Sequence, residues 1–314
     1  MRRVGHANII TEGSELHRLV THVGFRFELL RMRGIDNEPV FEINDPVLRE
    51  QERCLVSPAA PTGDSAVEAI SRAVTAAIGS RALPVVRFAD GEYLFYMQSM
   101  KCNGLYQQAE SPEAIRAAFP AHFRAMRQVA ASGLLAPLVF PGNVKVGRRS
   151  WRRFWKRPKS DDQALRFLDM TAAEGVHLQP GNYAPFYAVY AYLSGPEFAQ
   201  AVDGRTVGVI NSDFRAEACR AWFERRGSRP RVVHVPISDR FVATGWGRMR
   251  ESLLASLDPA VDLWMVGAGI GALEVCEEVS RVTGRPAIDS GHIVNAMNDL
   301  EAKSNGPRLF THAA

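Results

Sequence analysis

The sequence predicts an α/β protein with a mostly parallel sheet that is covered by helices on both faces. Two observations lead to this expectation. Beyond about residue 62, short apolar runs of strand length alternate with longer segments whose apolar residues recur at helical spacing. This alternation is typical of βαβ units. Glycine, proline or polar residues follow most of the apolar runs, as expected where a strand ends in a turn.

Residues 1–62 are predicted to form a helical N-terminal extension, and residues 63–314 the main domain. Within the extension, residues 15–32 carry Leu16, Leu19, Val23 and Phe27 at near-helical spacing, which predicts one amphipathic helix. The stretch 57–64 contains two prolines among alanine, glycine and polar residues, so it is expected to be a linker or exposed turn.

The elements of the main domain follow from the same periodicities. Asp64 or Ser65 is expected to cap a first helix, and Ser111, followed by Pro112 and Glu113, is expected to begin another. Helices are predicted at residues 64–80, 111–131, 214–226, 241–257 and 272–283. Strands are predicted at residues 83–88, 134–140, 206–210, 231–235, 262–266 and 286–288.

Composition and charge narrow the class of protein. Hydrophobic residues make up 46% of the 314 residues and charged residues 23%, which excludes a disordered chain. The net charge of +4 fits anionic partners such as nucleotides but does not indicate nucleic acid. The 4 cysteines lie far apart without a C-x-x-C pair, so we expect buried thiols and a cytoplasmic protein. We expect no secretory signal and no membrane span, so that any membrane association would be peripheral.

A first group of polar residues follows the predicted strand 83–88. Arg87 ends this strand, and Asp90, Gly91 and Glu92 come directly after it. In a tight turn, both carboxylates could point at one spot, where Mg²⁺ or Mn²⁺ would find oxygen ligands. Arg87 could then offer its planar donor fork to a phosphate. The alternative is an ordinary polar turn in which Arg87 pairs with a carboxylate.

A second group begins with a glycine turn between a predicted strand and helix. Gly267, Gly269 and Ala272 fit the dinucleotide fingerprint G-x-G-x-x-A, and Asp289 stands where an NAD-binding fold places its ribose-binding acid. An NAD(P)-dependent oxidoreductase using the turn from Gly267 to Ala272 is therefore an alternative. The turn, with Gly269 and Gly271, could equally bind the phosphates of another ligand or be a close-packed turn.

Two further segments lie at predicted strand ends. Asp289 and Ser290 lead through a glycine to His292, which could contact a phosphate or a sugar hydroxyl or could be structural. Ser212 and Asp213 follow the predicted strand 206–210 and could face the same cleft as Asp90, whereas residues of this kind after a strand more often cap a helix or form a turn.

The two groups together resemble the GT-D-type glycosyltransferases. That family carries R-F-G-D-G-E near the start of its domain and a strand, a glycine turn, a helix and A-I-D-I-G-H-I near its end. The matching stretches here are residues 87–92, with Ala89 in place of the first glycine, and residues 287–293, with Ser290 in place of an isoleucine. The resemblance covers roughly residues 65–295.

The resemblance implies a Rossmann-like domain that transfers a sugar, of the hexosyl type, from a nucleotide-sugar donor such as a UDP-sugar. It implies that Asp90 and Glu92 serve a divalent metal, Mn²⁺ or Mg²⁺, and the donor diphosphate, and that His292 belongs to the donor site. The acceptor would be a glycan, a protein or a lipid-linked molecule, as in polysaccharide or glycoconjugate biosynthesis.

This chain departs from the family after the G-H-I stretch. The family continues with acidic and aromatic residues, whereas this chain has residues 294–298, V-N-A-M-N. Asp299 or Glu301 would have to substitute from a shifted position. The group that activates the acceptor is therefore not identified, and a non-catalytic relative that binds a nucleotide sugar is a further alternative.

Residues 145–159 combine many basic residues with aromatic ones. Such a mixture suits docking of an anionic or lipid-linked acceptor, or contact with a membrane surface. The alternative is a solvated basic loop whose tryptophans pack inward. The candidate residues are Arg149, Trp151, Arg152, Arg153 and Trp155.

Overall fold

The centre of the protein is a parallel sheet of six strands in the order β4-β3-β8-β7-β5-β6. It is seen in a computed structural model, which describes residues 28–31, 53–56, 63–104, 106–138, 163–179 and 181–299. The predicted α/β class is confirmed. The strands are β3 (Leu83–Phe88), β4 (Leu134–Pro137), β5 (Thr206–Asn211), β6 (Arg231–Pro236), β7 (Leu263–Gly267) and β8 (Pro286–Asp289).

The inner strands are nearly continuous apolar runs because helices cover both faces of the sheet. All residues of β3 and β8 are buried. The pairing of β5 with β7 depends on a glycine, because a Cβ at Gly208 would lie 2.2 Å from the ring of Trp264. The large indole of β7 thus fills the space that Gly208 leaves open.

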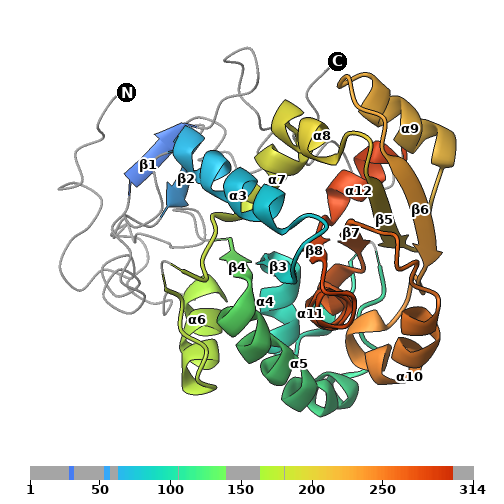
Figure 1. The fold of residues 1–314 in the computed structure, drawn as a ribbon. Coiled ribbons are helices and arrows are strands. Elements are labelled where there is room, and N and C mark those ends of the chain that lie inside the picture. Colours follow the sequence, from blue (N-terminus) through green and yellow to red (C-terminus); the bar gives the residue numbers. More distant parts are fainter. Residues whose placement is uncertain are drawn as a thin grey trace.

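Helices form a layer on each face of the sheet (Figure 1). One layer consists of α3 (Gly63–Ala77), α7 (Phe186–Ser194), α8 (Pro196–Val202), α9 (Ala216–Glu224) and α12 (His292–Met297). The other contains α5 (Pro112–Ser132), α10 (Val242–Ala255) and α11 (Ala272–Thr283), with α4 (Asp90–Tyr96) packed on α5 and α6 (Gln163–Ala173). Two short 3₁₀ helices, η2 (Met100–Cys102) and η4 (Gly269–Gly271), complete these elements.

Local sequence signals set several of these boundaries. Ser111 caps α5, since its Oγ accepts a hydrogen bond of 3.1 Å from the amide of Ala114, and Pro112 takes the first helical position. Gly284, with a φ of 66°, ends α11. These helices therefore begin and end close to the predicted residues.

Two sequence predictions differ from the structure, and helices α6, α7, α8 and α12 were not predicted. Residues 28–31, expected in a helix, form strand β1 (Glu28–Arg31), which pairs antiparallel with β2 (Arg53–Val56). The rest of the predicted N-terminal helix lies outside the described residues. Residues 90–96 form helix α4 rather than a turn. Helix α7 was not predicted because it is apolar almost all round, which leaves no polar stripe to mark the helical period.

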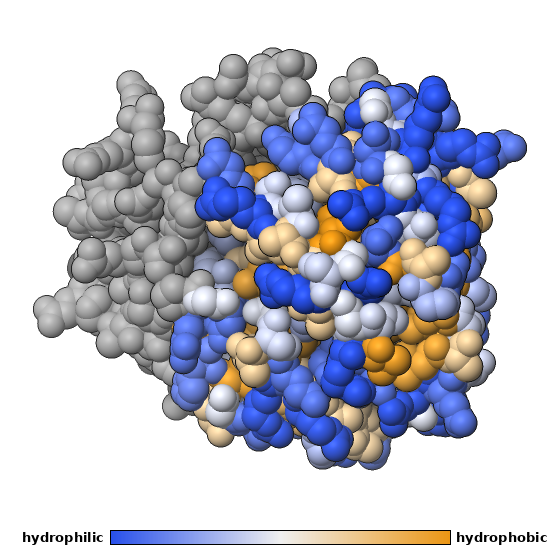
Figure 2. All heavy atoms as spheres, in the orientation of Figure 1, coloured by the Kyte–Doolittle hydropathy of each residue, from blue (hydrophilic) through white to orange (hydrophobic). Residues whose placement is uncertain are grey.

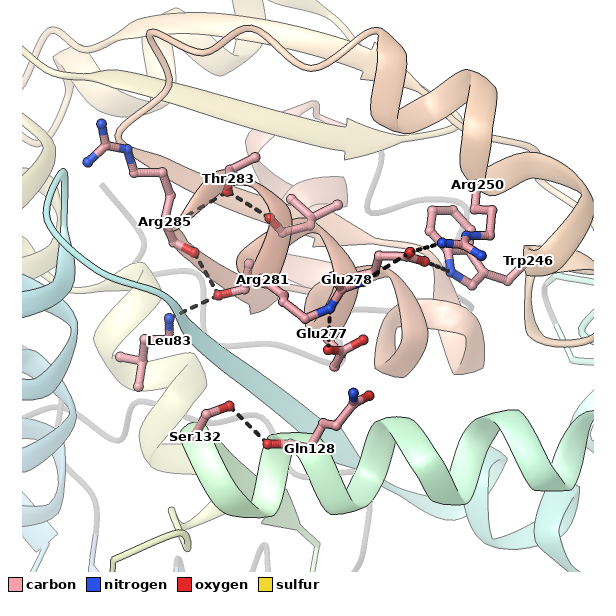
Figure 3. Close-up of polar contacts among 12 residues, drawn as sticks. Leu83, Gln128, Ser132, Trp246, Arg250, Glu277, Glu278, Arg281, Thr283 and Arg285 are labelled. Atoms are coloured by element: carbon pink, nitrogen blue, oxygen red, sulfur yellow. Dashed lines mark hydrogen bonds and ion pairs between the residues drawn. The ribbon is translucent and has the colours of Figure 1, made fainter.

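The amino ends of β3 and β8 are joined by side-chain contacts around α11. Ser280 of α11 accepts a hydrogen bond of 2.9 Å from the amide of Leu83, and its own Oγ–H donates to the carbonyl of Arg285 at 2.7 Å (Figure 3). One serine hydroxyl thus serves the starts of two neighbouring strands, which fixes this end of the sheet.

The surface in Figure 2 is mainly hydrophilic, with apolar side chains gathered in small areas. Three cysteines, Cys102, Cys219 and Cys276, are buried free thiols, as expected. Within the described part of the chain, no helix combines the length and apolar character needed to span a bilayer.

Candidate active site

The parallel sheet brings the predicted site residues to one edge. Because all strands run in the same direction, their carboxyl ends lie together, and this edge is where α/β sheets bind ligands. Asp90 and Glu92 follow β3, His292 follows β8, the glycine turn follows β7, and residues 212–213 follow β5. The edge therefore gathers both polar groups that the sequence singled out.

A buried ion pair joins the two motifs. Arg87 of β3 donates from Nη2 to Oδ1 of Asp289 and from Nε to its carbonyl oxygen, both at 2.8 Å. The backbone amide of Arg87 also donates to Oδ2 of Asp289 at 3.2 Å. The two residues are 202 positions apart in the sequence and only 6% and 5% exposed.

Aromatic rings and a glycine enclose this pair. The Cζ atom of Arg87 lies 3.9 Å from the ring centroid of Tyr190 and 5.1 Å from that of Phe186, both on α7. A Cβ at Gly291, whose φ is 44°, would stand 2.1 Å from Nη2 of Arg87. Burial alone would lower the pKa of Arg87, but the charge of Asp289, the nearby Tyr190 and the hydrogen bonds to both together more than offset this, and the pKa is raised above its ordinary value.

The contacts of Arg87 and Asp289 bear on both roles predicted for them. Arg87 was expected to offer its donor fork to a phosphate, and Asp289 to bind a ribose or a donor. In the structure each is engaged by the other in a buried setting. The pair therefore ties the carboxyl ends of β3 and β8 together, and with them the two motifs.

Asp90 and Glu92 occupy the first turn of α4. Ala89 is the N-cap, and Oε2 of Glu92 accepts a hydrogen bond of 2.8 Å from its amide. Asp90 is exposed, whereas Glu92 is half-buried. Residues two apart on a helix do not face each other. The expected tight turn is therefore a helix start, and the binding of one metal by both carboxylates stays a prediction.

Glu92 has an unusual carboxyl group. Burial raises its pKa from 4.5 to about 7, and the nearby charge of Asp289 acts in the same direction. The Ala89 amide and Arg87 lower the pKa but do not offset the burial. Glu92 therefore keeps its proton to a higher pH than an ordinary glutamate does. Among the residues that the structure describes, no three His, Cys, Asp or Glu side chains gather as metal ligands.

The glycine turn after β7 is occupied by a glutamine. Oε1 of Gln108 accepts a hydrogen bond of 3.0 Å from the amide of Ile270 in η4. A Cβ at Gly269, whose φ is 56°, would lie 2.7 Å from the Gln108 amide, and one at Gly271 would lie 2.4 Å from Val242. Both glycines thus admit protein groups. No local pattern marks Gln108, which lies in a loop 162 positions from Ile270 in the sequence.

The segment after β5 is linked to α12. Ser212 and Asp213 are half-buried, and their side chains lie 3.5 Å apart. Nδ2 of Asn298 donates to the carbonyl of Asp213 at 3.2 Å, and its Oδ1 accepts from the amide of Arg215 at 2.7 Å. His292 is the first residue of α12. Asn298, which sequence reasoning did not select, therefore holds the β5 loop against α12.

The alternative of an NAD(P)-binding site needs two groups that already bind other protein groups in the structure. The acid expected to bind a ribose, Asp289, is buried against Arg87. The Ile270 amide at the turn donates to Gln108. An NAD(P) site would also require the buried Arg87–Asp289 pair to open, which weighs against this alternative. The basic and aromatic stretch 145–159 lies outside the described residues, and its predicted role stays a prediction.

No protein-family model matches this chain, and no curated protein matches it. Two solved structures are similar in fold. One is a glycosyltransferase (DUF1792) from Streptococcus sanguinis, 14% identical with a TM-score of 0.47, covering 80% of this chain and 85% of its own. The other is a selenomethionine-substituted structure of domain of unknown function 1792, 14% identical with a TM-score of 0.46, covering 77% and 80%. Similarity at this level carries no information about the chemistry of the site.

Proposed function

We propose that this protein is a glycosyltransferase that moves a sugar from a nucleotide-sugar donor to an acceptor hydroxyl. One observation carries the proposal. The two motifs of the family resemblance, 202 residues apart, lie on hydrogen-bonded neighbouring strands and are joined by the Arg87–Asp289 pair at the carboxyl edge. Their coincidence at the edge where such sheets bind ligands supports a common site.

A divalent metal fits this site through a small set of ligands. Mg²⁺ and Mn²⁺ are commonly held by one or two carboxylates together with substrate phosphates and water. Asp90 is exposed and available, whereas one oxygen of Glu92 is engaged with the Ala89 amide. We therefore propose Asp90 as the main ligand and Glu92 as a secondary one. The metal would offset the charge that develops on the departing diphosphate.

The remaining candidate residues surround this position. A Cβ at Gly91 would meet no atom within 4 Å, so open space adjoins Asp90. His292, at the start of α12, would position a hydroxyl or a phosphate, and Ser212 and Asp213 would bound the donor on the β5 side. We further propose that the protein transfers a hexosyl group in the cytoplasm to a glycan, a protein or a lipid-linked acceptor. Residues 145–159 would provide peripheral membrane contact.

The test is a panel of nucleotide sugars assayed for hydrolysis and transfer with and without Mn²⁺. We expect Asp90→Asn to lower the rate by about 100-fold or more, because a metal-bound leaving group loses its charge stabilisation. Glu68→Gln is the matched control, since Glu68 is an exposed carboxylate on α3 with a side chain 65% exposed. Wild-type rates in both Asp90→Asn and Glu92→Gln would refute the site assignment.

A second candidate function is donor binding without turnover. The segment after His292 favours it. Asn295 and Asn298 are buried there, and the side-chain amide of Asn298 hydrogen-bonds to the backbone of Asp213 and Arg215. Neither asparagine can act as a base for the acceptor. Thermal stabilisation by UDP with Mn²⁺, combined with no turnover of any donor, would favour this reading.

A further inference from the structure

A short segment, residues 106–110, crosses the carboxyl edge of the sheet; we call it the strap. At one end, the hydroxyl of Tyr106 accepts a hydrogen bond of 3.3 Å from Nδ2 of Asn295 on α12. In the middle, Oε1 of Gln108 accepts from the Ile270 amide of η4 at 3.0 Å. At the other end, Glu110 contacts Thr244 and, at 3.3 Å, Arg248 of α10.

These anchors lie on both faces of the sheet. Helix α12 packs with α7 and α9, whereas η4 leads into α11, which packs with α5 and α10 on the opposite face (Figure 1). Neighbouring strands β8 and β7 thus send their chains to opposite faces at this edge. Open α/β sheets bind ligands at such switch points. By reaching elements on both faces, the strap lies across this switch point.

Gln108 is the residue that fastens the strap to the glycine turn. The residue is buried, with 8% exposed, and its side chain lies against Gly269, where any Cβ would collide with it. Its backbone amide is held by Oδ1 of Asn103 at 2.6 Å, which keeps the residue in place while the side chain bonds to Ile270. The bond to Ile270 is a single neutral hydrogen bond, and such a bond changes an equilibrium by roughly two- to tenfold.

We propose that the strap is a lid over a donor site at this switch point and that the Gln108 side chain is its latch. The nucleoside diphosphate part of the donor enters when Gln108 leaves Ile270. The apparent donor affinity is then the affinity of the open form multiplied by the fraction of molecules that are open. The ligand named in this inference rests on the proposed glycosyltransferase function, whereas the latch itself does not.

Hydrogen exchange of the Ile270 amide tests the latch without any ligand. Gln108→Ala removes the acceptor, and we expect the Ile270 and strap amides to exchange roughly two- to tenfold faster. Gln108→Glu keeps an acceptor and adds a negative charge near the start of α11, so exchange should slow. Gln107→Ala is the matched control, because exposed Gln107 contributes its backbone carbonyl, at 2.7 Å from the Phe241 amide. Equal exchange in Gln108→Ala and Gln107→Ala would overturn the latch.

Binding of UDP with Mn²⁺ by the same three variants tests the lid. We expect Gln108→Ala to bind UDP more tightly than Gln107→Ala by the factor seen in exchange, and Gln108→Glu to bind it more weakly. Weaker binding by Gln108→Ala would overturn the lid and make Gln108 a donor contact. Failure of UDP and of every other nucleoside diphosphate to bind wild type or variants would refute the proposed function, and the exchange result would still decide the latch.

Discussion

Two clusters of buried charge in this protein differ in how they are balanced. At the carboxyl edge, Arg87 and Asp289 are both buried, with side chains 5% and 7% exposed. On the outer side of α11, the side chain of Glu278 is 8% exposed, yet its partners Arg250 and Arg281 are 51% and 54% exposed (Figure 3). One cluster is sealed from water, and the other is open on its basic side.

The acids of the α11 cluster have more side-chain hydrogen-bond donors around them than the acids at the carboxyl edge of the sheet. Glu278 accepts from Nε1 of Trp246 at 2.9 Å and from both arginines, and Arg281 also reaches Glu277 at 3.2 Å. At the carboxyl edge, a single arginine lies near two acids, Asp289 and Glu92. Removal of a charge should therefore cost most where its buried partner is left without another cation.

The largest expected effect is that of Arg87→Ala. The substitution leaves the Asp289 carboxylate buried without a cation and a void beside Tyr190. We expect a loss of about 3–5 kcal/mol in the free energy of unfolding. Urea denaturation measures it, with Arg250→Ala as the control for loss of an arginine. A loss below about 1 kcal/mol would break the comparison, because it would mean that the sealed pair is no costlier to open than an exposed one.

Glu92→Gln should have the second largest effect on the free energy of unfolding, and this effect should depend on pH. Because the pKa of Glu92 is raised from 4.5 to about 7 in the folded protein, the fold favours its protonated form. The stabilisation is full below about pH 4.5 and is lost as pH rises through about 7. Glutamine keeps the Ala89 contact without a charge, so the variant should exceed wild type by up to about 3 kcal/mol at pH 8 and lose this advantage near pH 5.

Urea titrations at these two pH values, with EDTA to remove metal, provide the measurement. Glu68→Gln serves as the control, because its carboxylate lies exposed on α3. A pH-independent difference between Glu92→Gln and wild type would show that the pKa of Glu92 is not raised in the folded protein. The carboxyl edge would then hold its second acid as readily as the α11 cluster holds its acids.

Glu278→Ala should have an intermediate effect on stability. It leaves the buried Trp246 Nε1 without its acceptor, while both arginines can turn to solvent. We expect a loss of about 2 kcal/mol, most of it from the unpaired indole N–H. The variant Glu278→Gln retains an acceptor for Trp246 and should recover part of the loss. An equal loss in both variants would mean that the ionic contacts, rather than the indole bond, dominate.

Arg250→Ala should have the smallest effect, under about 1 kcal/mol, because a half-exposed arginine gains little from an ion pair. Its contribution should fall further in high salt, since exposed pairs are screened. Thermal unfolding at low and high salt checks both statements. A loss as large as that of Arg87→Ala would remove the distinction between the open and the sealed cluster.

Much of the fold could be predicted because it rests on local patterns. The strands β3, β5 and β7 are short apolar runs followed by turn residues, and the amphipathic helices α5 and α11 repeat their apolar residues at the helical period. Capping residues such as Ser111 mark boundaries through hydrogen bonds to residues only three positions away. The amphipathic period failed for residues 28–31, which pair with a distant strand, and for α7, which has no polar face.

The sequence by itself determined the α/β class and the two polar groups that meet at the carboxyl edge, because strand periodicity and motif spacing are local properties. Only the tertiary structure decided how those groups are used. It paired Arg87 with Asp289, turned residues 90–92 into a helix start, and placed Gln108 on the glycine turn. Each of these contacts joins side chains or backbone through strand order and helix packing, which no local pattern encodes.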